Sequence, residues 1–145
     1  MKLPVPEPGL VIRYSYLWAS EAQLRREEGV KDRPCAIVLV VRNEADDLIV
    51  RVLPVTHSPP NDPQEALEMP AATKARLGLN AERSWVVLTE SNEFAWPGPD
   101  LRPAVPGDAG SVAFGFLPPR FFRALRDRLV ELHRQRRHAR VSRTE

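Results

Sequence analysis

The 145-residue sequence has one cysteine and no long apolar run, and these shortages exclude several kinds of structure. Cys35 has no partner for an intramolecular disulfide, so the fold has to be stable without covalent cross-links. No apolar run approaches the roughly 20 residues of a membrane-spanning helix. Residues 1–6 also lack the apolar stretch of a secretory signal. We therefore expect a cytoplasmic protein with no membrane partner.

The motifs of several enzyme classes are missing as well. The sequence contains no glycine-rich phosphate-binding loop and no serine in a nucleophile-elbow pattern. His133 and His138 would lie apart on a regular helix, and no cysteine or acidic cluster joins them as zinc ligands would require. Cys35 lies inside an apolar run, where burial keeps a thiol protonated and inert. We predict no metal site and no other cofactor.

The remaining composition is typical of one small globular domain. With 43% hydrophobic and 28% charged residues, a chain of this length can bury one core but not two, so residues 1–145 are expected to form a single domain. The net charge is only +2, yet arginines accumulate in the predicted helix and tail at about 118–145. These arginines could attract RNA phosphates. Alternatively, they form the solvated face of a helix whose end frays.

Apolar patterns predict short strands, one short internal helix and one long helix near the end of the sequence. Strands are predicted at 10–18, 34–41, 48–55, 65–69, 84–90 and 111–117. The run at 34–41 is expected to be buried on both faces and to pair antiparallel with 48–55, and 91–110 is expected to be a loop. Helices are predicted in three segments. A charged helix runs from a capping box at 20–23 to Gly29, and a short helix covers 71–77 before Gly78. A longer helix is predicted from the amphipathic stripe between Phe121 and Leu132. This pattern indicates a mainly β fold with helices, built as a small barrel-like or curved antiparallel sheet closed by a helix.

Arg33 is the strongest candidate for chemistry. It stands where a charged segment meets a predicted central strand, a position that combines an accessible side chain with a rigid base. A guanidinium can clamp a phosphate and offset the charge that develops during phosphodiester cleavage. The structural alternative is an ion pair with Asp32 or another carboxylate at the strand end.

Thr56 and His57 follow the predicted strand at 48–55. The threonine hydroxyl can bond a phosphate oxygen or a ribose hydroxyl, or it can bond locally to the backbone as the strand gives way to a turn. Imidazole suits proton transfer near neutral pH, although a surface histidine in a loop is the simpler interpretation. Neighbouring strand residues point to opposite faces, so both can serve one site only if the backbone turns there.

Two motifs carry a resemblance to a known family. They are the segment 29–39, with glycine, then Arg33, a proline and an apolar strand, and the segment 52–56, in which a proline and an aliphatic residue precede Thr56. In this order, followed by 84–87, Gly115 and the terminal helix, they resemble the MazF/PemK family of toxin ribonucleases. The resemblance spans roughly residues 8–132. It implies an SH3-like small β-barrel closed by a C-terminal α-helix.

The resemblance also implies a function and partners. The family members are metal-independent endoribonuclease toxins of type II toxin-antitoxin systems, which cleave single-stranded RNA through attack of a ribose 2'-hydroxyl. They form homodimers and bind a cognate antitoxin protein. By this resemblance Arg33 and Thr56 are catalytic, and the proton acceptor is unassigned. His57 is a further catalytic candidate because of its imidazole and its place next to Thr56.

The resemblance suggests further substrate-binding residues. Ser84 begins the segment 84–87, Glu90 ends a third motif at 86–90, and Arg25 and Arg26 lie in the charged segment before Arg33. Glu90 falls near an acidic residue of some family members, but it could instead cap the end of its strand. Leu88 stands where some members carry an arginine, which would remove one cationic contact.

Two other functions fit the same pattern. The first is a noncatalytic nucleic-acid-binding or protein-binding module, because small barrels host many functions. The second is a toxin that acts on a protein by docking its terminal helix, which requires exposed apolar residues near the end of the sequence. The arginine-rich end does not favour this second alternative.

Overall fold

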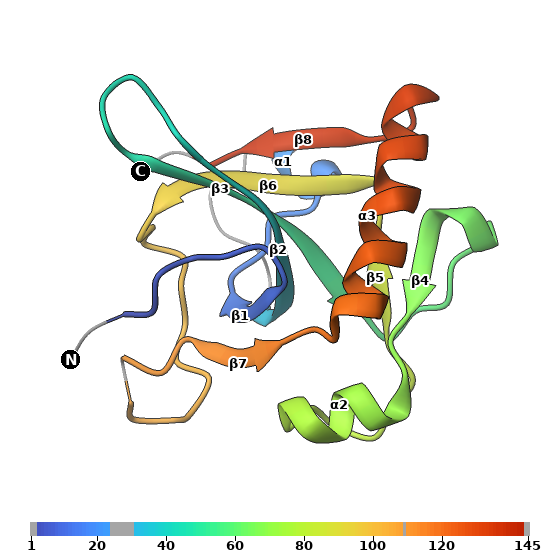
Figure 1. The fold of residues 1–145 in the computed structure, drawn as a ribbon, viewed down its shortest axis with the longest axis horizontal. Coiled ribbons are helices and arrows are strands. Elements are labelled where there is room, and N and C mark those ends of the chain that lie inside the picture. Colours follow the sequence, from blue (N-terminus) through green and yellow to red (C-terminus); the bar gives the residue numbers. More distant parts are fainter. Residues whose placement is uncertain (1–2, 24–30, 109, 144–145) are drawn as a thin grey trace.

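The computed structural model describes residues 3–23, 31–108 and 110–143. Within them the protein is mainly β, as predicted, with three helices around one sheet (Figure 1). The strands are β1 (Leu10–Tyr14), β2 (Arg33–Arg42), β3 (Leu48–Thr56), β4 (Ala66–Glu68), β5 (Trp85–Val87), β6 (Glu90–Trp96), β7 (Ala113–Phe116) and β8 (Ala139–Ser142). The helices are α1 (Ala19–Gln23), α2 (Ala71–Leu77) and α3 (Pro119–Arg134), and a 3-10 turn η1 (Pro63–Glu65) precedes β4.

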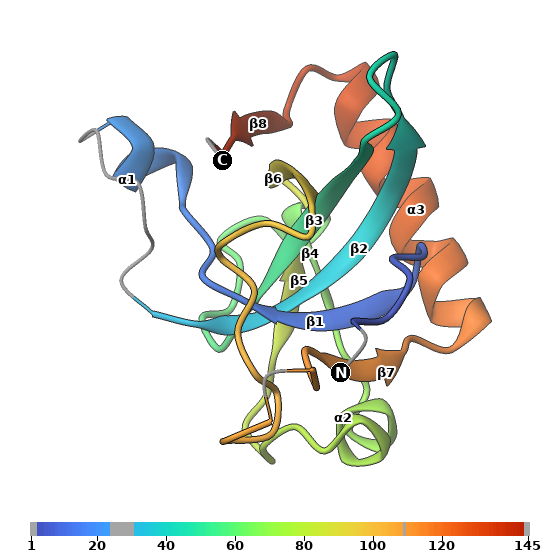
Figure 2. The ribbon, with the colours of Figure 1, turned by 90° about the vertical axis from the view of Figure 1, so that its left-hand side faces the viewer.

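The strands form one curved sheet in the order β4-β5-β3-β2-β1-β7, with β6 on β3 and β8 on β6. All pairs are antiparallel except β6 with β8. Figure 2 shows the curvature, with α1 and α3 on opposite sides of the view. Among the described residues the pairings do not close the sheet into a barrel.

Strand β3 shares one edge between two partners. Its pairing with β6 runs to Val52, opposite Asn92, and its pairing with β5 begins at Val55, opposite Val86. Pro54 lies in the gap between them, where a residue without an amide donor is compatible with the break in the ladder. The end of β3 therefore leaves the main sheet and joins the small β4–β5 extension.

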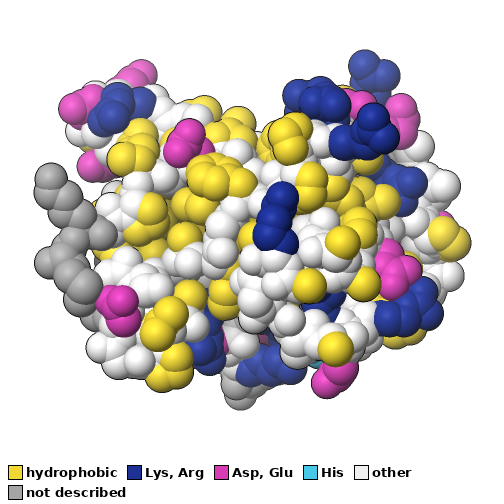
Figure 3. All heavy atoms as spheres, turned by 60° about the horizontal axis from the view of Figure 1, so that its bottom comes forward, with side chains coloured by type: hydrophobic (Ala, Val, Ile, Leu, Met, Phe, Trp, Pro, Cys, Tyr) yellow, Lys and Arg dark blue, Asp and Glu magenta, His cyan; other side chains and the backbone are white. Residues whose placement is uncertain are grey.

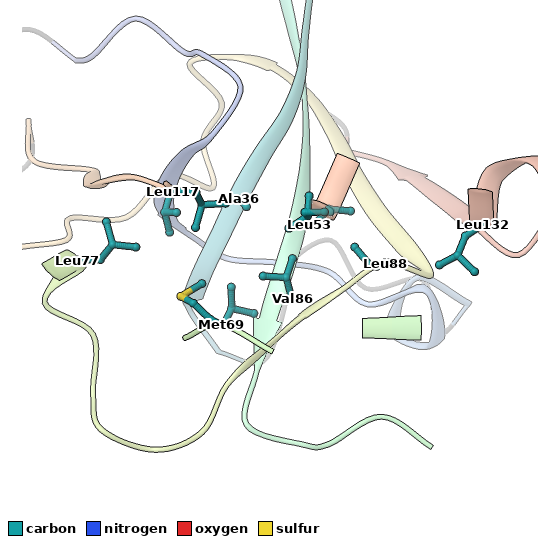
Figure 4. Packing of buried hydrophobic residues seen from close by; sticks show 11 residues of the cluster. Ala36, Leu53, Met69, Leu77, Val86, Leu88, Leu117 and Leu132 are labelled. Atoms are coloured by element: carbon teal, nitrogen blue, oxygen red, sulfur yellow. The ribbon is translucent and has the colours of Figure 1, made fainter. Parts of the chain in front are cut away.

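Two apolar clusters fill the two faces of the sheet. Successive side chains of β2 point to opposite faces of the sheet, so Ala36 packs in one cluster while Cys35 and Ile37 pack in the other. Figure 4 shows the first cluster, in which side chains from β2, β3, β5, α2 and α3 meet. The prediction of a strand buried on both faces is thus correct for the first half of β2. It is wrong for the second half, where Leu39 and Val41 are exposed.

Other boundaries were predicted with mixed success. The hairpin of β2 and β3, helix α2 and helix α3 are confirmed, and Gly78 ends α2 in the left-handed conformation with φ 73°. The strand predicted at 10–18 stops at Tyr14, and the one at 84–90 is shorter, covering only β5. Helix α1 begins at Ala19, and Glu21 in its first turn accepts a hydrogen bond through Oε1 from the Trp18 amide at 3.0 Å.

Two predicted irregular segments are strands instead. The loop expected at 91–110 begins with β6, and the frayed end expected after α3 contains β8. Hydropathy missed β6 because its buried residues include polar Ser91 and Asn92. Asn92 makes two backbone bonds, in which Oδ1 accepts from the Leu17 amide at 2.9 Å and Nδ2 donates to the Leu17 carbonyl at 2.7 Å. Satisfied amides of this kind allow a polar strand to be buried.

Arg143, the residue that follows β8, bonds to groups that are distant in sequence. Its side chain is 2% exposed and forms an ion pair with Asp100 at 3.0 Å. Nη1 also donates to the Ser15 carbonyl at 2.7 Å and to Asn92 Oδ1 at 3.0 Å. The guanidinium therefore connects the end of β8 to β6 and to the segments that contain Ser15 and Asp100.

Replacing Arg143 with alanine should destabilise the protein by about 3–5 kcal/mol, because it removes the buried cation beside Asp100. Urea unfolding followed by tryptophan fluorescence measures the change. Arg140→Ala is the matched control, because this exposed β8 residue makes only a 3.5 Å pair with Glu93 and should lose less than about 1 kcal/mol. Equal losses in the two variants would contradict this stabilising role of Arg143.

Candidate functional site

A pocket of about 350 Å³ lies where the start of β2 and the end of β3 face α2 and the segment 79–84. It brings together three predicted catalytic residues, Arg33, Thr56 and His57, and the predicted substrate residue Ser84. The backbone turn that the sequence required is present, because β3 ends at Thr56 and the chain bends at 57–58. The rest of the lining consists of Lys31, Asp32, Pro34, Val55, Ser58, Lys74, Leu79 and Asn80.

Arg33 and Thr56 lie at the same end of the β2–β3 hairpin. The pairing of the two strands ends at Cys35 opposite Pro54, and Arg33 and Thr56 each lie two residues beyond that pair. The guanidinium lies 5.0 Å from the centre of the Trp18 ring, and Nη1 donates to the Val55 carbonyl at 3.2 Å. These contacts hold the side chain at the pocket without neutralising its charge.

The structural alternative for Arg33 was an ion pair with Asp32. That carboxylate instead lies 3.9 Å from Arg13 and 3.6 Å from Arg102. Within the described segments, no carboxylate lies within ion-pair distance of Arg33, and its Nε is buried without a hydrogen-bond partner. Among the described residues, Arg33 is therefore a pocket-lining cation with no carboxylate paired to it.

Thr56 and His57 are both bonded to neighbouring groups. Thr56 Oγ1 accepts from the Ser58 amide at 3.2 Å, which is the local backbone bond considered from the sequence. The hydroxyl proton is not used by that bond. His57 lies at the rim with its side chain 38% exposed, and Asn80 Nδ2 lies 3.2 Å from its Nε2.

Lys74 is a pocket residue that the sequence interpretation missed. It is 4% exposed on α2, and its Nζ donates to Ser84 Oγ at 2.7 Å, to Asn80 Oδ1 at 3.1 Å and to the Glu82 carbonyl. Burial lowers the pKa of this amine, and the Glu82 carboxylate opposes the shift. Its spacing of three residues from buried Leu77 was the available signal, because such pairs share one helix face.

Glu90 is not part of the pocket lining. Its Oε1 accepts from the Ala19 amide at 2.9 Å and from the Tyr16 hydroxyl at 3.1 Å, so it anchors the start of α1. Burial raises the pKa of this carboxyl. Glu90 also begins β6 rather than capping the end of a strand. Leu88 is fully buried in the core, so a side chain there does not face the pocket (Figure 4).

Arg25 and Arg26 lie outside the described residues. Near the end of the sequence, Arg128, Arg137 and Arg143 connect parts of the fold, whereas most of the other arginines are exposed, as expected for a solvated helix face; these are Arg120, Arg123, Arg126, Arg134, Arg136 and Arg140. Arg137 pairs with Asp62 at 2.8 Å and Glu65 at 3.3 Å, which ties the end of α3 to η1. Arg128 donates to backbone carbonyls in the same region.

His133 and His138 are close together, contrary to prediction. Their ring centres lie 5.7 Å apart because α3 ends at Arg134 and the chain turns back at Arg136, where φ is 56°. His138 is held by the Leu88 carbonyl at 2.7 Å from Nδ1 and by Ser91 Oγ at 2.8 Å from Nε2. No group of three or more metal-ligating side chains occurs in the part of the chain that the structure describes.

A second hollow of about 570 Å³ lies between α2, β7 and the start of α3. Phe114, Phe116 and Phe122 line it, and Arg76 is the one charged residue among the described residues of its lining, with Nη2 donating to the Phe116 carbonyl at 2.7 Å. Figure 3 shows hydrophobic side chains across much of this side of the molecule. With few polar groups, this hollow is an apolar surface and not a site for chemistry.

Comparisons with protein-family models, curated proteins and solved structures find no match. Among the residues that the structure covers, no helix has the length and apolar character needed to cross a lipid bilayer.

Acidification should destabilise the protein through His138. Burial, together with His133 and Arg51, lowers the pKa of His138 below its ordinary value of 6.5, while the bond to Leu88 opposes the shift. The unfolded chain therefore binds the proton more readily, so stability is full above about pH 6.5 and falls as the pH drops below it. Urea unfolding between about pH 7.5 and 5.5 should show a smaller loss for His138→Gln than for the wild type.

His133→Gln serves as the control for this prediction, because His133 lies near His138 but is exposed. It should keep most of the wild-type loss. An unchanged pH dependence in His138→Gln would show that this imidazole does not carry the effect.

Proposed function

We propose that this protein is a metal-independent endoribonuclease that binds single-stranded RNA at the pocket containing Arg33. The observation that carries the proposal is that Arg33 and Lys74 line one pocket, and no carboxylate among the described residues lies within ion-pair distance of either. Two such cations favour an anionic ligand with several acceptor oxygens, as a phosphodiester has.

The resemblance to MazF/PemK toxins supplies the reaction class. In it the ribose 2'-hydroxyl attacks the neighbouring phosphorus, leaving a cyclic phosphate and a 5'-hydroxyl. Arg33 would bind a nonbridging phosphate oxygen and offset the charge that develops in the transition state. Thr56 would donate its remaining hydroxyl proton to the phosphate or orient the 2'-hydroxyl.

The same resemblance supports the rest of the proposal. The protein would act in the cytoplasm as the toxin of a type II toxin-antitoxin system, as a homodimer with an antitoxin protein as its partner. Its curved sheet with α3 would be an open variant of the SH3-like barrel. The hairpin that joins β2 to β3 and carries Arg33 and Thr56 at its base supports this comparison.

A noncatalytic RNA-binding module is the second candidate. One observation favours it, since Lys74 and His57 already have hydrogen-bond partners at every polar side-chain atom. A pocket of this kind can hold a phosphate without supplying a proton acceptor. Binding without cleavage is the result that distinguishes this candidate.

Replacing Arg33 with alanine should lower the rate of RNA cleavage by about 100-fold or more, because the developing charge loses its main partner. Purified protein is incubated with single-stranded RNA in chelator, and the cut ends are mapped for cyclic phosphate and 5'-hydroxyl. Arg33→Lys keeps the charge without the planar fork, so it should give an intermediate rate. Thr56→Ala should also reduce the rate.

Arg42→Ala is the matched control, since Arg42 lies exposed at the opposite end of β2. It should cut RNA as fast as the wild type, and thermal unfolding verifies that each variant is folded. Intact RNA with every protein, including the wild type, would rule out the nuclease. Equal cleavage by Arg33→Ala and wild type would rule out this pocket.

A further inference from the structure

We infer that His57 is the proton acceptor of this pocket through Nε2, and that Asn80 and Lys74 are the positioning residues that keep this nitrogen unprotonated. The inference rests on the proposed nuclease function. It supplies the acceptor that the resemblance leaves unassigned. Each nitrogen of the His57 ring lies next to a group that can only donate or only accept a hydrogen bond, and these groups determine the ring tautomer.

The hydrogen bonds that determine the state of Nε2 begin at Lys74. Its ammonium can only donate, and it lies 3.1 Å from the Asn80 atom assigned as Oδ1, which also accepts from the Glu82 amide at 3.2 Å. Two donors at this position require the oxygen there, so the amide nitrogen of Asn80 faces His57 at 3.2 Å. An amide nitrogen can only donate, so Nε2 of His57 has to accept.

The hydrogen bonds at Nδ1 independently give the same answer. His57 Nδ1 lies 3.0 Å from the Arg83 carbonyl, which can only accept, so Nδ1 carries the proton. Ser84 Oγ is 3.1 Å from the same nitrogen, and it accepts from Lys74 and lies 3.2 Å from the Glu82 carbonyl, to which it donates. The polar hydrogens of Lys74, Ser84 and His57 then each have an acceptor, with Nε2 unprotonated.

Among the residues that the structure describes, the other titratable side chains that line the pocket are poor proton acceptors. Asp32 is engaged by Arg13 and Arg102, and Lys74 donates to three acceptors as an ammonium. Lys31 and Arg33 are cations at neutral pH. His57 remains, next to Thr56 and with its side chain 38% exposed to an arriving ligand.

The proton transfer balances as follows. The RNA 2'-hydroxyl replaces the Asn80 amide as the donor to Nε2 and transfers its proton there while the bond from O2' to phosphorus forms. The bond from phosphorus to O5' breaks, and the leaving oxygen takes a proton from water. The imidazolium then returns its proton to solvent, so no oxidant, metal or other reactant is consumed.

Nitrogen-15 NMR of the histidine side chains at about pH 8, where imidazole is mostly neutral, tests the tautomer without RNA. The wild type should show His57 with Nδ1 protonated and Nε2 unprotonated. In Asn80→Asp a carboxylate faces Nε2 and accepts a proton from it, so the His57 signals should change to a protonated Nε2. Asn80 is exposed, so this variant leaves the core intact.

Asn61→Asp is the matched control, because Asn61 is exposed, lies outside the pocket lining and undergoes the same change of charge. It should keep the wild-type His57 signals and the wild-type rate of RNA cleavage. His57→Ala should lower that rate by about 100-fold or more, the usual contribution of a general base. Asn80→Asp should lower it by about tenfold or more, in step with the change of tautomer.

The outcomes separate the two proposals. A wild-type His57 with Nε2 protonated would overturn the positioning role of Asn80 and Lys74, whatever the nuclease assay shows. The expected tautomer with wild-type cleavage by His57→Ala would overturn the acceptor role while leaving the nuclease in place. Intact RNA in the wild-type reaction would remove the proposed nuclease, and the acceptor role with it.

Discussion

The division of one edge of β3 between β6 and β5 determines how the rest of the molecule is arranged. As far as Val52 the strand belongs to the main sheet, and from Val55 it belongs to the small extension formed by β4 and β5. This change of partner brings the end of β3 toward α2 and the segment 79–84. The pocket exists because Arg33, at the start of the neighbouring strand, lies beside the strand end that has been redirected.

The electrostatics of the pocket depend on a buried ammonium. Taking Lys74 out of water is unfavourable, and the structure offsets this with three acceptors, none of which is a carboxylate. Its hydrogen bonds are satisfied while its charge remains, so the pocket combines local rigidity with a positive potential. Arg33 adds a second cation, positioned by an aromatic ring and a backbone carbonyl. A phosphate ligand matches both the charge and the geometry of this arrangement.

Local patterns in the sequence predicted the elements that depend on local physics. The β2–β3 hairpin, α2 with Gly78 and α3 follow from apolar periodicity and turn chemistry, and Arg33 and Thr56 were placed at one end of that hairpin. Strands β6 and β8 were missed because they are stabilised by buried polar contacts over long sequence separations, as in the bond between Asn92 and Leu17. For Lys74 the helical spacing from Leu77 indicated a buried position, but its own segment does not show the acceptors that surround the amine. The hydrophobic pattern predicts which face is buried, but not which polar groups meet across the fold.

The position of Arg143 has a consequence for how the protein acquires its structure. This residue bonds to Ser15, 128 positions earlier in the sequence, and β8 completes one edge of β6. Contacts between such distant segments form late, because a large loop has to close before they become favourable. During synthesis, the region around Ser15 and Asn92 must therefore wait for residue 143 to leave the ribosome. Until then one edge of β6 lacks its partner strand, and the Ser15 carbonyl lacks the donor that Arg143 supplies.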